Sequence, residues 1–159
     1  MAVEKSEEKL QQKLSKISLP KYQDLPNLDL YMDQVIDEIN QYLIPITKTA
    51  ITKSMINSYV KKGIVDRPTK KRYSRVQLAK LLVVSILKPI LSLDAITQAL
   101  RIAMKLDSVD NAYDQFVTLF NTELKQIDIP NLSAKQYQSM AIKSLLYKLL
   151  VEDLITRNI

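Results

Sequence analysis

The sequence of 159 residues contains no cysteine, no histidine, no tryptophan and a single glycine, Gly63. Without cysteine and histidine, the chain has no disulfide, no thiol nucleophile, no Ser-His-Asp triad, and no thiolate or imidazole ligand for a metal. With one glycine it cannot form a glycine-rich phosphate loop or a dinucleotide-binding fingerprint. These absences leave a binding protein or an enzyme that works with carboxylates alone. Of these two we predict a protein that is not an enzyme and that holds no cofactor or metal.

Long hydrophobic runs are also lacking. The most apolar stretch, residues 81–87, lies between Lys80 and Lys88 and is far shorter than the ~20 residues that a membrane-spanning helix needs. Residues 1–10 are charged and have no apolar core of the kind found in a signal peptide. Because 47% of the residues are hydrophobic and 25% are charged, the composition is that of a globular protein. We therefore expect a soluble, cytoplasmic protein with no membrane association.

Positive charge is present and is concentrated in one part of the chain. Residues 48–75, called the basic segment below, carry nine basic side chains and one acidic side chain, Asp66. The net charge of +6 is therefore +8 on this segment and −2 on the remainder. Such a concentration favours a polyanionic partner, such as the phosphate backbone of a nucleic acid. The nine residues are Lys48, Lys53, Lys61, Lys62, Arg67, Lys70, Lys71, Arg72 and Arg75.

Apolar periodicity and capping signals predict an almost entirely helical chain. Asn27 is a candidate cap for a helix that runs to about residue 43, where Pro45 is expected to end it. Further helices are expected at 3–17, 52–62, 75–91, 93–106, 109–126 and 134–157, with a turn or small β-hairpin at 64–73. The helix at 75–91 begins with a Ser74–Gln77 capping box and is apolar on almost every side, so we expect it to be central.

The helix at 52–62 has one apolar side and one polar side. Lysines, hydroxyls and an amide occupy the polar side, and such groups can bind phosphates or base edges. A solvated face is the ordinary explanation for a polar helix side, but here a basic wing follows directly, and the two together favour DNA. For Tyr73, core packing is the alternative to a phosphate contact. The predicted DNA-binding residues are Lys53, Ser54, Asn57, Ser58, Lys61, Lys62, Arg67, Lys70, Lys71, Arg72, Tyr73 and Arg75.

The order of these motifs resembles two known families. The sequence TKSMINSYVKKGIV at residues 52–65 is similar to the recognition helix and exit turn of the MerR-type winged helix-turn-helix. A closer resemblance, over residues 19–121, is to a bacterial domain-of-unknown-function family numbered 1836. It rests on LP at 19–20, LYMDQV at 30–35, TKSMIN at 52–57 and KKRYSR at 70–75, together with LK at 87–88 and LS at 91–92. The resemblance implies an all-α fold with a winged helix-turn-helix core and a small β-hairpin wing. The short wing and Pro45 depart from the MerR pattern.

We therefore expect a transcriptional regulator that binds double-stranded DNA. Helix 52–62 would read the major groove, and the wing at 66–75 would hold the phosphate backbone. The alternative is a non-catalytic protein–protein interaction module that uses the same surface to bind an acidic partner. The expected organisation is a charged N-terminal helix or arm at 1–18, a MerR-like domain at 19–106, and a helical extension at 107–159.

Two further features leave alternatives open. The last helix is apolar over more of its surface than one packing face needs, so it either packs on the core or forms a homodimer interface. A cleft between the last three helices could hold an apolar small-molecule effector. Separately, Asp29, Asp33 and Asp37 are four residues apart, with Glu38 adjacent. They would form either a magnesium or acid–base site or, as we favour, a solvated acidic face.

Overall fold

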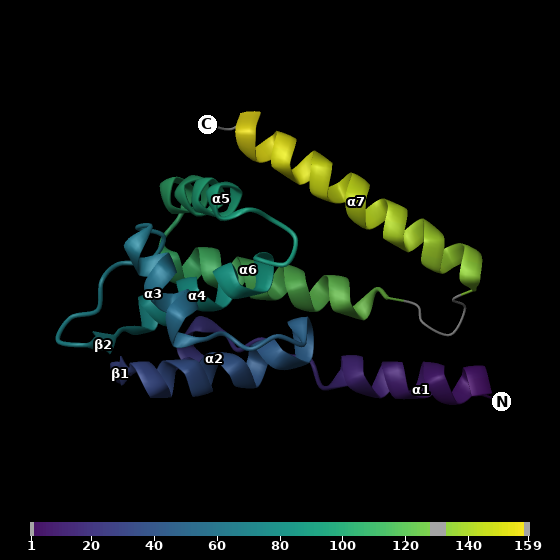
Figure 1. The fold of residues 1–159 in the computed structure, drawn as a ribbon, viewed down its shortest axis with the longest axis horizontal. Coiled ribbons are helices and arrows are strands. Elements are labelled where there is room, and N and C mark those ends of the chain that lie inside the picture. Colours follow the sequence, from purple (N-terminus) through teal and green to yellow (C-terminus); the bar gives the residue numbers. More distant parts are fainter. Residues whose placement is uncertain (1, 128–132, 158–159) are drawn as a thin grey trace.

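The computed structural model describes residues 2–127 and 133–157 (Figure 1). Within these residues the chain is mostly helical and carries one small antiparallel sheet of two strands, as the sequence predicts. In chain order the elements are α1 (Ala2–Ser15), the 3-10 helix η1 (Tyr22–Asp24), β1 (Leu30–Tyr31), α2 (Met32–Thr47), α3 (Lys53–Lys61), β2 (Arg72–Tyr73), α4 (Arg75–Leu87), α5 (Leu93–Leu106), α6 (Val109–Lys125) and α7 (Ala134–Arg157).

The centre of the molecule is α4, as its apolar sequence predicts. Eight of its 13 residues are buried, and it packs between α2 and α6. The capping box at its start is formed, because Ser74 Oγ accepts from the Gln77 backbone N–H at 3.4 Å and Gln77 Oε1 accepts from the Ser74 N–H at 2.7 Å. The helix ends at Leu87, shortly before Pro89. A fixed central helix gives the surrounding elements a common support.

The boundaries of α2 differ from those expected. Asn27 does not cap it, because the chain first forms β1, and the helix begins only after Tyr31. Pro45 does not end it either. The proline lies in the last turn and is exposed, and its missing N–H costs one hydrogen bond at most, so the helix continues to Thr47. Lys48 then ends α2 with a left-handed backbone, at a φ of 58°.

The short helix α3 ends as its glycine predicts. Gly63 has a φ of +75°, which strains any residue with a side chain. Its N–H donates to the Val60 carbonyl at 3.0 Å, and the Ile64 N–H donates to the Tyr59 carbonyl at 3.0 Å. These two bonds form a Schellman motif, and buried Ile64 anchors the chain as it leaves the helix.

The predicted β-hairpin at 64–73 is only partly correct. A tight turn is present, because Thr69 and Arg72 exchange two backbone hydrogen bonds at 3.0 and 3.1 Å. The strand that follows it, β2, pairs with β1 from before α2, with Leu30 opposite Tyr73 and Tyr31 opposite Arg72. Sequence periodicity could not show this partner, because the two strands are separated by the whole of α2 and α3. The sheet ties the starts of α2 and α4 together.

The last helix, α7, is unlike α4 despite its many apolar residues. None of its 24 residues is buried, and its contacts are mainly with α5 (Figure 1). Ile155 is the α7 residue that packs partly buried against the core. In the described parts of the chain, no helix combines the length and the apolar character needed to cross a membrane.

Candidate nucleic-acid interface

The predicted binding residues are almost all at the surface. Nine of the twelve side chains are exposed, Ser58 and Arg75 are half-buried, and Tyr73 is buried. Figure 1 shows α3, the connection after it and β2 together at one end of the molecule. None of the basic side chains of the basic segment forms a salt bridge with another described residue. The charge is therefore free to act on an external partner.

Two contacts fix the start of α3. The side chain of Asn40, on α2, bonds the backbone of Ile51 twice, accepting from its N–H at 2.8 Å and donating to its carbonyl at 3.2 Å. Thr52 then caps the helix, accepting from the Met55 N–H at 3.3 Å. The apolar side of α3 is buried through Ile56 and Tyr59. These anchors leave the predicted polar side facing outward.

Buried Gln77 holds the connection between α3 and the turn at residues 69–72, which is called the basic turn below. Its amide nitrogen donates to the carbonyls of Asp66 at 2.8 Å and Arg67 at 3.1 Å. The same side chain supplies the capping bond at the start of α4. One amide therefore fixes residues 66 and 67 relative to the central helix.

The tip of the basic turn is two lysines in the left-handed region. Lys70 has a φ of 52° and Lys71 a φ of 65°, and both are exposed. Positive φ at both central residues is the pattern of a type I′ turn, in which Asn-Gly is the preferred pair. A non-glycine residue in this region costs about 1–2 kcal/mol. The turn therefore carries its two charges at the expense of conformational strain.

Tyrosines position two of the arginines. The Arg72 guanidinium lies 5.0 Å from the centre of the Tyr31 ring and donates to the Tyr31 hydroxyl at 2.9 Å. The Arg75 guanidinium lies 5.4 Å from the Tyr22 ring and its Nε donates to the Pro26 carbonyl at 3.4 Å. Each guanidinium keeps further N–H groups for an external acceptor. These contacts hold the two cations in place before any partner binds.

Tyr73 lies in the core. It is 3% exposed, and burial raises the pKa of its hydroxyl. Tyr59 is 2% exposed, and its hydroxyl has no hydrogen-bond partner among the described residues. Burial also raises the pKa of Tyr59. Neither side chain reaches a partner on the surface, so we leave Tyr73 out of the candidate interface.

The three aspartates expected on one helix face do not share a helix. Asp33 and Asp37 are exposed on α2, whereas Asp29 precedes both β1 and the helix. No group of three or more acidic side chains among the described residues is arranged to hold a metal ion. The expected single helical stripe of Asp29, Asp33 and Asp37 is therefore incorrect, because the helix begins later than predicted.

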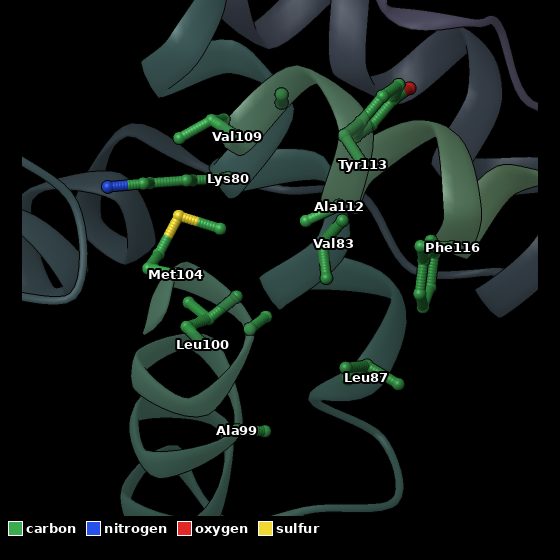
Figure 2. Close-up of a pocket in the computed structure, with 12 residues that line it drawn as sticks. Lys80, Val83, Leu87, Ala99, Leu100, Met104, Val109, Ala112, Tyr113 and Phe116 are labelled. Carbon is green, nitrogen blue, oxygen red and sulfur yellow. The ribbon is translucent and has the colours of Figure 1, made fainter. Parts of the chain in front are cut away.

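A separate cavity of about 160 Å³ lies between α4, α5 and α6 (Figure 2). Its lining is apolar except for Lys80, whose stem lies between Val109 and Met104 with the ammonium pointing away from the other residues. The Tyr113 hydroxyl donates to the Pro20 carbonyl at 2.8 Å and does not serve the cavity. A cavity of this size accepts an apolar group about as large as benzene. The cleft expected between the last three helices is instead formed without α7.

Sequence reasoning missed the residues that hold this interface together. Asn40, Gln77 and the two tyrosines Tyr22 and Tyr31 act on groups between 10 and 53 positions away along the chain. The sequence identifies Gln77 only as a capping residue, because its hydrogen bonds to the carbonyls of Asp66 and Arg67 depend on the path of the loop. Tyr31 could have been found only from its pairing with Arg72 in the sheet. Sequence periodicity does not show which strands pair.

Comparison with known proteins identifies one family. The family described as Domain of unknown function (DUF1836) matches residues 20–121, which run from just before η1 into α6. No curated protein and no solved structure matches the chain significantly. The family match excludes α1 and α7 and includes the whole basic segment. Because it covers more than half of the 159 residues, the chain belongs to the DUF1836 family.

Proposed function

We propose that this protein is a transcriptional regulator that binds double-stranded DNA through a MerR-like winged helix-turn-helix region. In this proposal α3 lies in the major groove, and the turn at residues 69–72 contacts the phosphate backbone of the flanking DNA. The interface comprises the exposed or half-exposed side chains Lys53, Ser54, Asn57, Ser58, Lys61, Lys62, Arg67, Lys70, Lys71, Arg72 and Arg75.

The observation that carries the proposal is the strained turn. A pair such as Asn-Gly would form this turn at lower cost, yet Lys70 and Lys71 occupy it and are exposed. Backbone strain at an exposed position is tolerated where the side chains have a task. The two lysines add positive charge at this position, and positive charge favours binding of phosphate groups.

The polar side of α3 favours DNA over an acidic protein. Ser54, Asn57 and Ser58 are short side chains placed between lysines, so the helix can approach base edges closely. Asn57 offers the donor and acceptor that pair with adenine, and the major groove is wide enough for one helix. An acidic protein would be bound by the cations alone and would not need these short polar groups.

The proposal is tested by selecting bound sites from a random duplex pool and measuring binding of a selected site by fluorescence anisotropy. We expect Asn57→Ala to weaken the selected site by about tenfold or more, since a bidentate base contact contributes roughly 1–3 kcal/mol. Lys71→Ala should weaken selected and random duplexes alike, because a phosphate contact is independent of sequence.

A matched control removes charge elsewhere. Lys105 and Lys125 are exposed on α5 and α6, outside the basic segment. Lys105→Gln with Lys125→Gln should leave DNA affinity almost unchanged. If duplex DNA is not bound at low salt, or if Asn57→Ala and Lys71→Ala bind as the unmodified protein does, the proposal is wrong. Binding of an acidic protein but not of DNA would establish the interaction-module alternative.

A further inference from the structure

The surface of α7 is strongly apolar for a helix that is exposed along its whole length. Between Tyr137 and Val151, nine large apolar side chains are each 41–62% exposed. They lie on all sides of the helix, and since such side chains offer about 200 Å² each when fully exposed, they leave on the order of 900 Å² uncovered in all. Each partner in a standard protein interface contributes about 800 Å².

Four of these side chains, Ile142, Leu146, Leu149 and Leu150, lie on the side of the helix away from the core. Ile155 packs partly against the core, and Glu152 is the other half-buried residue of α7. Leu146 and Leu150 lie one turn apart on the opposite side of the helix, 51% and 58% exposed. This row of four apolar side chains is thus turned away from the core and is more than half exposed.

We propose that α7 pairs with α7 of a second copy of this chain, and that the two helices run antiparallel. The charges of α7 decide the orientation. Residues 134–150 carry three lysines and no acidic residue, whereas Glu152 and Asp153 are followed by the single basic residue Arg157. A parallel pair would place the two lysine-bearing halves side by side. An antiparallel pair places each of them beside the acidic end of its partner.

The register follows from the same helix. When the two helices cross near Lys148, Leu146 of one lies at the level of Leu150 of the other, and Lys143 lies at the level of Asp153. The pairing buries the row of leucines and brings Lys143 to the level of Asp153, which also pairs with Arg157 of its own helix at 2.6 Å. The two Lys148 side chains are level at the crossing but lie on the Ile155 side of each helix, away from the leucine row. The pairing uses no residue of the basic segment. It is therefore independent of the proposed DNA binding and is tested separately.

The first test is mass in solution, measured by analytical ultracentrifugation without DNA. We expect the unmodified protein to sediment as a dimer of the 18.3 kDa chain at tens of micromolar. Leu146→Glu with Leu150→Glu should give a monomer with an unchanged helical circular dichroism spectrum, because neither side chain is buried. Leu106→Glu is the matched control, since Leu106 is an 81% exposed leucine on α5, and it should remain a dimer. A monomeric unmodified protein, or a double variant that stays dimeric, would overturn the proposal.

The second test fixes the orientation by disulfide trapping. The chain contains no cysteine, so every disulfide reports an introduced pair. Ser139 and Arg157 are five turns apart on the side of α7 that carries Leu146, and the ~27 Å between them prevents a bond within one helix. Ser139→Cys with Arg157→Cys should form a covalent dimer on mild oxidation, whereas Ser139→Cys alone should not. A covalent dimer of Ser139→Cys alone shows a parallel pair and rejects the antiparallel one.

Discussion

The basic segment and α7 are two surfaces that the fold leaves uncovered, and they differ in almost every physical respect. The first is charged, lies within the DUF1836 match and is held by specific hydrogen bonds from Asn40 and Gln77. The second is apolar, lies outside the match and contacts its own chain mainly through α5. We therefore expect the charged surface and the apolar surface to bind different partners and to respond differently to salt.

The largest expected difference between the two surfaces is the dependence of their binding affinities on salt concentration. If about five phosphates are neutralised, the log–log salt slope of DNA affinity is about −4 to −5, so a fourfold rise in salt weakens binding by roughly 500-fold. The α7 dimer is held by apolar contact and should change its dissociation constant by only a few-fold. Anisotropy with duplex DNA and sedimentation of the protein alone measure the two effects. A salt-independent DNA affinity would remove the distinction.

Substitution in the core should affect both surfaces through the fold. Leu81 is fully buried on α4, and Leu81→Ala should lower the free energy of unfolding by about 3 kcal/mol, from lost burial and the cavity left behind. Leu145→Ala, at a leucine of α7 that is 57% exposed, should cost less than about 1 kcal/mol in dilute protein. Urea denaturation measures both. Equal losses would show that α7 is packed as α4 is.

Relief of strain in the basic turn should raise the stability of the fold and weaken DNA binding. Lys70→Asn with Lys71→Gly supplies the preferred type I′ pair, so we expect a gain of about 1 kcal/mol in unfolding free energy and, in the same variant, weaker DNA binding. Lys48→Gly is the control, because Lys48 also has positive φ but lies at the far end of α2 from the turn. It should gain stability and keep its DNA affinity. Loss of stability in the double variant would contradict the strain argument.

The smallest expected effect is at Tyr113, which is buried on α6. Tyr113→Phe removes the bond to the Pro20 carbonyl and should cost about 1 kcal/mol at pH 7. Burial is the main cause that raises the pKa of Tyr113 above its ordinary value of 10.0. The unfolded state therefore loses its proton first, and the stability that this group provides is complete below pH 10 and is lost as the pH rises further. Urea denaturation at pH 7 and pH 11 should show the difference between the two proteins shrinking or reversing. A larger deficit of the variant at pH 11 would show the opposite sign.

Sequence periodicity predicted the helices well because their signals are local. The capping box of Ser74 and Gln77, the end of α3 at Gly63 and the central position of α4 all follow from residues within a few turns of one another. Local reasoning failed where distant segments compete. Residues 30–31 pair with β2 and delay the start of α2, and Pro45 is tolerated because it lies in a last, exposed turn.

The candidate site was predicted as a set of charges and not as an arrangement. Lys70 and Lys71 were recognised as basic, but their left-handed backbone depends on the pairing of Thr69 with Arg72 and could not be derived from composition. Tyr73 illustrates the reverse error. An aromatic residue beside a basic run was included as a phosphate ligand, although its place in the strand turns its side chain into the core.

The contact between Tyr31 and Arg72 has a consequence for how this surface can vary among related chains. Tyr31 carries no charge and lies outside the basic segment, yet its ring and hydroxyl set the direction of an arginine 41 positions away. A chain that exchanges Arg72 for lysine loses the planar group that rests on the ring and has less reason to keep an aromatic residue at position 31. Positions 31 and 72 should therefore change together in an alignment, and this covariation would trace the two-residue sheet without any structure.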